Sequence, residues 1–161
     1  MAEVIVSPRS DEAQWLLHCA PGDATAVGAS LGIVLGPTML LAEASGGWHA
    51  LHLAPDEWLL IGAAGACPAT PALPHSLVDI SERSLGFTIS GVDAAATLNA
   101  GCPLDLSDRA FPPGACTRTL FGKVMVMLWR TGHTDWRIDC GRSFVPYVAA
   151  LLELAREDAD D

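Results

Sequence analysis

Short apolar runs alternate with turn residues along most of the chain, and this pattern predicts more strands than helices. In the first half the expected strands are residues 12–20, 38–43, 47–53 and 57–62. The last two form a hairpin, because the turn residues Ala54, Pro55 and Asp56 separate them. One helix is predicted from Asp23 to about Leu31, and Asp23 is suited to cap its N-terminus.

The second half shows a similar order of elements. They are strand material at 76–91, a short helix at 92–101, a long strand at 117–129, a turn at 130–134 and a returning strand at 135–140. Asp93 is expected to cap the short helix, which ends near Gly101. An amphipathic helix is predicted at 143–156, and its apolar face comprises Phe144, Tyr147, Val148, Leu151, Leu152 and Ala155.

Both halves therefore follow the order strand, helix, strand, strand, which predicts an α+β fold of two related βαββ-type units packed into one small domain. Glu57–Trp58 and Asp135–Trp136 each follow a turn and support the repeat. The alternative, two ordinary hairpins that begin alike, stays open. A proline-rich loop at 66–75 cannot form regular structure and is predicted to join the two halves.

The expected domain is residues 1–156, with halves at roughly 1–66 and 76–156 and an acidic tail at 157–161. Of the 161 residues, 50% are hydrophobic and 17% charged, against the ~25% charged that is usual in soluble domains. So low a charge indicates either a surface covered by another chain or a biased composition. The net charge of −10 disfavours nucleic acid and anionic membranes as partners.

The beginning of the chain carries charges where a secretory signal needs an apolar segment, so we expect a cytoplasmic protein. The uncharged run 24–42 contains glycines and a proline, and it is better explained by a helix, a turn and a strand than by a membrane span. We expect no membrane partner.

Nothing in the sequence predicts a catalytic, cofactor-binding or metal-binding residue. The five cysteines lack zinc-ligand spacing, and Cys102 and Cys116 lie in a turn-rich stretch without a histidine. His49 and His52 would point to opposite faces of a strand and could not share a metal. No glycine pattern matches a nucleotide-binding loop.

The carboxylates have simple structural explanations. Asp79 lies in an otherwise apolar run, and we expect it to accept hydrogen bonds from nearby backbone donors in a tight turn. Asp105 and Asp108 suit turn and capping roles around Ser107, or ion pairs with Arg109 or Arg118.

Four segments together carry a family resemblance: "LAPDEWLLIG" from Leu53, "VDISERSLGFTISGVDAAATLNA" from Val78, "GCPLDLSDRAFPPGACTRT" from Gly101 and "GRSFVPYVAALLELA" from Gly141. They resemble the gamma subunits of heterotetrameric sarcosine oxidases. The resemblance implies a fold like the N-terminal folate-binding region of glycine-cleavage aminomethyltransferases. It also implies alpha, beta and delta partner subunits that hold FAD, FMN, NAD, zinc and the tetrahydrofolate site.

The resemblance further implies a non-catalytic structural subunit of a complex that oxidatively demethylates sarcosine to glycine. Candidate anchors on the partner surface are Arg109, Arg118, Arg137 and Arg142, and the apolar excess predicts self-association of the isolated chain. One alternative is a free-standing folate-binding or one-carbon-transfer domain, with Asp79 or Asp105 meeting the pterin. Another is a gamma-like subunit of a related N-methyl amino acid dehydrogenase.

Overall fold

The computed structural model describes residues 4–9 and 11–160, which group into two compact units. Unit 1 contains residues 4–9 and 83–160, and unit 2 contains residues 11–82. The proline-rich loop at 66–75 lies inside unit 2, so the chain passes between units at other positions than those expected, near residue 10 and between Glu82 and Arg83.

Unit 2 is an antiparallel sheet with one helix on a face. Its elements are β2 (Glu12–Cys19), the 3-10 turn Pro21–Asp23, α1 (Ala24–Leu31), β3 (Ala42–Ser45), β4 (Trp48–Ala54), β5 (Glu57–Ala63) and β6 (His75–Asp79). The strand order is β3-β4-β5-β2-β6. The helix ends where Gly32 adopts a left-handed conformation (φ 70°) and its N–H bonds back to the carbonyls of Ala29 and Gly28.

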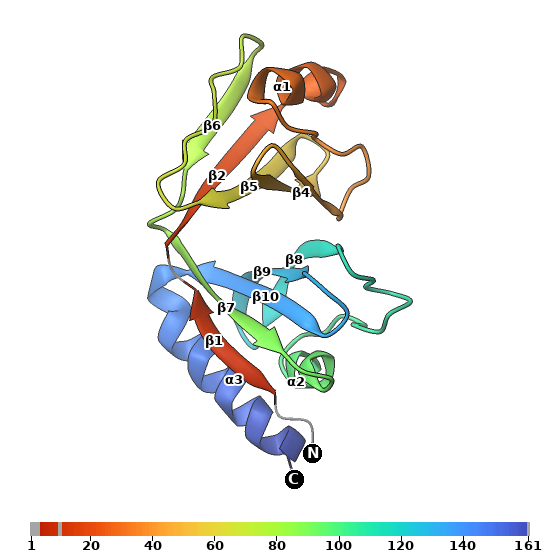
Figure 1. The fold of residues 1–161 in the computed structure, drawn as a ribbon. Helices are drawn as coiled ribbons and strands as arrows, with labels where there is room; N and C mark the ends of the chain where they lie inside the picture. The colour runs from red at the N-terminus through yellow and green to blue at the C-terminus, as the bar shows by residue number, and fades with distance from the viewer. Residues whose placement is uncertain (1–3, 10, 161) are drawn as a thin grey trace. The chain divides into compact units, whose positions relative to one another are not determined.

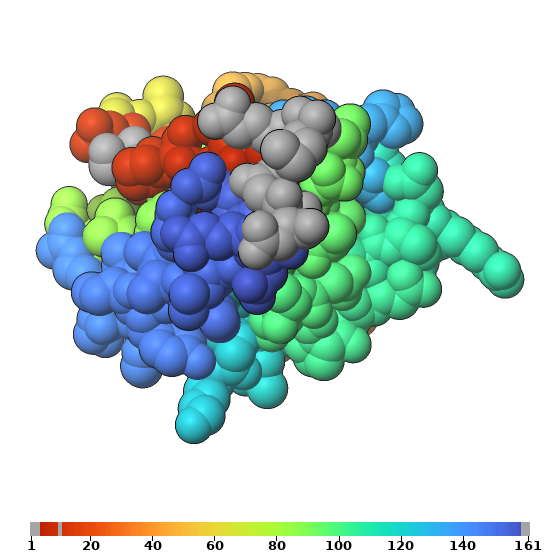
Figure 2. Space-filling view, turned by 90° about the horizontal axis from the view of Figure 1, so that it is seen from below, coloured from red at the N-terminus to blue at the C-terminus, as the bar shows by residue number. Residues whose placement is uncertain are grey.

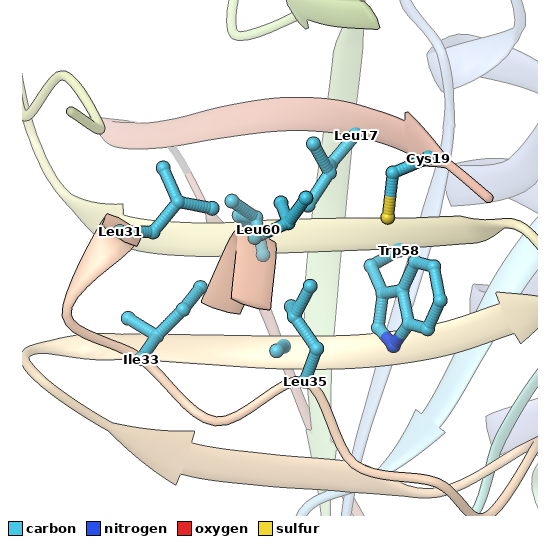
Figure 3. Close-up of a cluster of buried hydrophobic side chains, with 9 residues drawn as sticks. Leu17, Cys19, Leu31, Ile33, Leu35, Trp58 and Leu60 are labelled. Carbon is cyan, nitrogen blue, oxygen red and sulfur yellow. The ribbon is translucent and has the colours of Figure 1, made fainter. Parts of the chain in front are cut away.

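The core of unit 2 lies between this sheet and α1. Figure 3 shows Leu35 beside Trp58, with Cys19 above the indole, Leu60 further along β5 and Leu31 at the end of α1. The cluster comprises Leu17, Cys19, Val27, Leu31, Ile33, Leu35, Ala50, Trp58 and Leu60. Alternate residues of β2, β4 and β5 supply the sheet side of the cluster, as the strand pattern predicts.

Unit 1 is also an antiparallel sheet. Its elements are β1 (Ile5–Arg9), β7 (Ser84–Ser90), α2 (Ala94–Asn99), β8 (Cys116–Phe121), β9 (Val124–Arg130), β10 (Asp135–Gly141), the 3-10 turn Arg142–Phe144 and α3 (Val145–Asp160). The strand order is β1-β7-β10-β9-β8, and α3 packs against both α2 and β10 (Figure 1).

Several sequence predictions need correction. The long strand expected at 117–129 is a hairpin, because the chain turns at Gly122 (φ 60°) between β8 and β9. The strand expected at 38–43 begins only at Ala42, and β1 was not predicted. Asp23 and Asp93 occupy the predicted cap positions, but neither side chain makes a capping hydrogen bond.

The last helix begins slightly later and runs further than expected. Val148, Leu152 and Ala155 are buried as predicted. Phe144 and Tyr147 are not, since 50% and 42% of their surfaces are exposed.

The two sheets have the same topology, which confirms the α+β class. The repeated unit has one strand more than the expected order, because β3, β4 and β5 follow α1 and β8, β9 and β10 follow α2. Unit 1 follows the order β8-β9-β10-β7-β1 where unit 2 follows β3-β4-β5-β2-β6. Trp136 pairs with Arg130 across β10 and β9, as Trp58 pairs with His52 across β5 and β4. Each repeat is completed by an edge strand from the other end of the chain order. The strand β1 comes just before β2 in the chain but pairs with β7, and β6 comes just before β7 but pairs with β2.

Candidate partner interface

The stretch from Gly101 to Thr119 is an ordered turn. The Asp105 carboxylate accepts a hydrogen bond from the Ser107 N–H at 2.9 Å, and this bond lowers the pKa of Asp105. Asn99 donates its side-chain amide to the carbonyl of Leu104 at 2.6 Å. These local bonds fix the loop between α2 and β8 and confirm the turn role expected for Asp105.

Arg130 holds the far part of the same loop. Its guanidinium donates to the Phe111 carbonyl at 2.8 Å and to the Asp108 carboxylate at 2.5 Å. It also donates to the carbonyls of Gly132 and His133, and only 4% of the residue is exposed. The ion pair of Asp108 is therefore with Arg130 and not, as expected, with Arg109 or Arg118. Sequence reasoning had assigned Arg130 only to a turn.

Two aromatic contacts complete this arrangement. The Arg130 guanidinium lies over the Trp136 ring, 4.9 Å from its centroid. The Phe111 ring stacks on the same indole with centroids 5.5 Å apart. Phe111 and Trp136 are both buried, so this loop closes over Trp136.

Two of the buried cysteines, Cys19 and Cys140, have thiols whose pKa is raised by burial. Cys19, Cys102, Cys116 and Cys140 are buried and Cys67 is exposed, and none forms a disulfide. Burial, with a smaller contribution from Asp139, raises the pKa of Cys140 to about 11. Burial likewise raises the pKa of Cys19. The thiols of Cys19 and Cys140 therefore stay protonated at neutral pH and fill the interior.

Asp79 is also a turn residue. Its carboxylate accepts hydrogen bonds from the Ser81 hydroxyl at 2.6 Å and the Ser81 N–H at 2.9 Å, and these bonds lower its pKa. Asp79 and Asp105 are exposed, and neither lines the two hollows described below. Among the described residues, no group of three His, Cys, Asp or Glu side chains could hold a metal ion.

The four arginines expected at a partner surface do not behave alike. Arg109, Arg118 and Arg142 are exposed. Arg137 is only 1% exposed and donates to the Asp139 carboxylate at 2.7 Å. Its charge is therefore compensated inside unit 1, and Arg137 is not a surface anchor.

Unit 2 contains an open apolar groove of about 730 Å³ between α1 and the ends of β4 and β5. It is lined by Pro21, Ala24, Thr25, Ala29, Ile33, Val34, Leu35, Gly36, Pro37, Met39, His52, Pro55 and Trp58. Among these, Val34 and Met39 are 53% and 44% exposed, although large apolar side chains usually avoid water. Sequence reasoning missed this groove because its lining comes from separate segments.

His52 and Trp58 are stacked in the wall of this groove, with ring centroids 4.4 Å apart and an interplanar angle of 16°. His52 is 5% exposed and Trp58 is 1% exposed. Within the described chain, neither ring nitrogen of His52 nor Nε1 of Trp58 has a hydrogen-bond partner. Buried polar atoms without a partner are rare and call for an explanation.

The smaller hollow of unit 1, about 320 Å³, lies at the corresponding place between α2 and the ends of β9 and β10. Arg130 and Trp136 line it where His52 and Trp58 line the groove of unit 2. The Arg130 guanidinium already donates hydrogen bonds to four protein acceptors. This differs from His52, whose ring nitrogens have no partner among the described residues.

A second apolar surface lies on α3 and the 3-10 turn that precedes it. Phe144, Tyr147 and Leu154 are at least 42% exposed, and Figure 2 shows this helix in blue beside the green segment that contains α2. In the part of the chain that the structure describes, no helix has the length and apolar character needed to cross a bilayer.

Comparison with known proteins identifies relatives of the chain. The family model described as "Sarcosine oxidase, gamma subunit family" matches residues 17–158. The "Sarcosine oxidase subunit gamma" of Corynebacterium sp. (strain P-1) is 32% identical over 145 residues, which are 83% of this chain and 70% of that protein. That of Arthrobacter sp. is 33% identical over 132 residues, 76% of this chain and 64% of that protein.

The corresponding subunit of Corynebacterium sp. (strain U-96) is 33% identical over 148 residues, 84% of this chain. The matches span 64% to 70% of the length of these relatives. A chain in the heterotetrameric sarcosine oxidase of Corynebacterium sp. U-96, solved with pyrrole 2-carboxylate, has the same fold: the TM-score is 0.85 at 27% identity, over 96% of this chain and 84% of that one. The chain belongs to the sarcosine oxidase gamma subunit family.

Proposed function

We propose that this chain is a non-catalytic structural subunit of a heterotetrameric sarcosine oxidase. The observation that carries the proposal is the match of 96% of the chain, at a TM-score of 0.85, to a chain in a complex of that name. The complex would demethylate sarcosine oxidatively to glycine. The methyl carbon would pass to tetrahydrofolate or leave as formaldehyde, with hydrogen peroxide formed.

The chemistry of the described residues supports a structural role. A nucleophile needs a neighbouring base or a lowered pKa, whereas burial raises the pKa of Cys19 and Cys140. Asp79 and Asp105 are engaged in their own turns. These two thiols and two carboxylates therefore have local structural roles.

We further propose that the alpha, beta and delta subunits hold the FAD, FMN, NAD, zinc and folate sites of the complex. This assignment is supported by the membership of the chain in the sarcosine oxidase gamma subunit family and by its match to a chain of a heterotetrameric sarcosine oxidase. The likeness to the folate-binding region of aminomethyltransferases and the cytoplasmic location stay predictions.

The exposed residues indicate how the chain would bind its partners. Interfaces of permanent complexes are rich in apolar side chains, with arginines as polar anchors. The chain exposes Val34 and Met39 in unit 2 and Phe144 and Tyr147 in unit 1. Arg109, Arg118 and Arg142 are the candidate anchors.

Co-expression tests this function. The three other subunits would be produced with and without this chain, and sarcosine-dependent hydrogen peroxide would be measured on the purified material. We expect a stable, active heterotetramer only when the chain is present, and no flavin absorbance or oxidase activity from the chain alone. An unchanged active complex without the chain, or tight tetrahydrofolate binding by the chain alone, would contradict the proposal.

A further inference from the structure

The internal repeat allows the two hollows to be compared position by position. The Gly114 N–H donates to the Arg130 carbonyl at 2.7 Å, and the Leu40 N–H donates to the His52 carbonyl at 2.8 Å. Arg130 and His52 in turn donate their own N–H groups to Ala115 and Leu41. Gly114 and Leu40 both have positive φ, 92° and 62°. The two backbones are therefore equivalent at these positions.

In unit 1, the chain closes its own hollow. Phe111, three residues before Gly114, stacks on Trp136, and its carbonyl accepts a hydrogen bond from the buried Arg130. One residue thus supplies both an aromatic ring for the tryptophan and an acceptor for the buried donor.

In unit 2, both of these contacts are missing. The residue three positions before Leu40 is Pro37, which lines the groove and offers no aromatic ring. The connection from α1 to β3 is also shorter, residues 32–41 against residues 100–115 between α2 and β8. The groove stays open at about 730 Å³, and the ring nitrogens of His52 have no partner among the described residues.

An apolar residue with a strained backbone, Leu40, directly follows the groove residue Met39. Leu40 adopts the left-handed conformation that its counterpart Gly114 tolerates without cost, yet its side chain is 40% exposed. Such backbone strain at an exposed position is typical of a binding site. The exposed side chains of Val34 and Met39 form an apolar rim of the groove, and Leu40 directly follows Met39 in the chain.

We propose that this groove receives an aromatic side chain from a larger subunit of the complex. The ring packs beside Trp58 as Phe111 packs on Trp136. A backbone carbonyl of the same partner segment accepts a hydrogen bond from His52, which is buried in the groove wall, once lining side chains such as Met39 move aside. This inference rests on the proposed function and adds to it the place and the chemistry of one contact.

The charge of unit 2 indicates what accompanies the aromatic residue. Residues 11–82 contain eight Asp or Glu and no Lys or Arg. Glu43 lies against the groove residue Gly36, where an added Cβ would be 2.6 Å from its Oε1. Asp23 and Asp56 directly neighbour the lining residues Ala24 and Pro55. The partner segment therefore carries Lys or Arg close to its aromatic residue.

The proposal can be tested by filling the groove of unit 2 with an aromatic ring from this chain, so that the partner's ring can no longer enter. Pro37→Phe introduces a phenylalanine at the position equivalent to Phe111, and Val78→Phe adds the same ring at an exposed position of β6 outside the groove. Each full-length variant would be co-expressed with the other three subunits, and the fraction of purified complex that contains the chain would be measured. Circular dichroism of each isolated variant would establish that it is folded.

We expect Pro37→Phe to reduce incorporation about tenfold or more, and Val78→Phe to leave it unchanged. Normal incorporation of a folded Pro37→Phe variant, or an equal loss in both variants, would overturn the groove proposal while the subunit role stands. Failure of the unmodified chain to assemble would instead overturn the subunit role itself.

A cross-link identifies the occupant. A photoreactive p-benzoylphenylalanine in place of Val34, at the rim, would be irradiated in the assembled complex and the products mapped by mass spectrometry. We expect a cross-link to one peptide of a larger subunit that contains an aromatic residue and a nearby Lys or Arg. Cross-links only within this chain, to a second copy of it or to a small molecule would overturn the proposal.

Discussion

A buried imidazole without a hydrogen-bond partner lowers stability, and His52 is such a side chain. His52→Leu removes the two nitrogens and keeps an apolar side chain over Trp58. It loses ring stacking of about 1 kcal/mol but relieves a polar burial cost of about 1–3 kcal/mol. We therefore expect the free energy of unfolding of the isolated chain to rise by about 1 kcal/mol, measured by urea denaturation.

The control for His52→Leu is His49→Leu on the same strand, where the imidazole is exposed. We expect the control to change stability by less than about 0.5 kcal/mol. A clear loss of stability in His52→Leu alone would show that its ring nitrogens have a partner within the chain, and would remove one basis for the groove proposal.

Cys140 makes the chain sensitive to alkali. Its pKa is about 11 in the folded chain against an ordinary value of 9.0, so the unfolded thiol ionises first as the pH rises. The stability that this buried thiol contributes is complete below pH 9 and is lost between pH 9 and 11, by up to about 2–3 kcal/mol.

Urea unfolding at pH 8, 9, 10 and 11 would measure this effect. Cys140→Ala should be less stable than the unmodified chain at pH 8, and the difference between the two should shrink toward pH 11. A constant difference over this range would show that the thiol does not titrate differently in the folded chain.

Individual side chains were predictable from the sequence only where their partners are close along the chain. The roles of Asp79 and Asp105 could be predicted because the serine that binds each carboxylate is two residues away. The pair of Asp108 and Arg130 spans 22 residues, and nothing in the local pattern favoured Arg130 over Arg109. The burial of Arg137 could not be predicted either, because the sequence of β10 does not show which parts of the protein cover each face of the sheet.

At the level of elements, the loop from α2 to β8 depends on one buried cation. Arg130→Met leaves the Phe111 carbonyl without its donor and Asp108 without its counterion. We expect a loss of about 3 kcal/mol in the free energy of unfolding. Faster hydrogen exchange of the loop amides, measured by mass spectrometry, would accompany it.

Arg109→Met is the matched control, because it removes the same charge from an exposed position in the same loop. Its effect should be within about 0.5 kcal/mol. Equal effects of the two substitutions would show that the hydrogen bonds of Arg130 do not hold the loop.

The same loop needs a glycine at one place. Gly114 has a φ of 92°, and an added Cβ would meet nothing within 4 Å, so Gly114→Ala tests backbone strain alone. We expect a loss of about 1–2 kcal/mol on thermal unfolding. Gly22→Ala, where an added Cβ also meets open space but φ is not positive, should be neutral or slightly stabilising. A neutral Gly114→Ala would contradict the strained conformation.

Elements with strong local signals were predictable, and those defined by their partners were not. The hairpin of β4 and β5 has an obvious turn, and α1 has both a start and a stop signal. The turn at Gly122 was missed because only Gly122 and Lys123 interrupt an apolar run. The strand β1 became visible only through its pairing with β7, more than 70 residues away.

For the whole molecule, the repeat explains why one unit is closed and the other is open. Both units place a tryptophan at the start of the equivalent strands β5 and β10, and this echo was visible in the sequence. Which residue lies over each tryptophan was not visible, because it depends on loops of different length. The open copy is the one with exposed apolar rim residues and no Lys or Arg among residues 11–82.

The most direct test of the account is to purify the tagged chain from its native host. Native mass spectrometry and a flavin absorbance spectrum would then be recorded on the purified material. We predict one copy of the chain with two larger flavin-bearing chains and one small zinc-binding chain. Recovery of the chain alone, colourless and monomeric, would contradict the assignment as a structural subunit of a sarcosine oxidase complex.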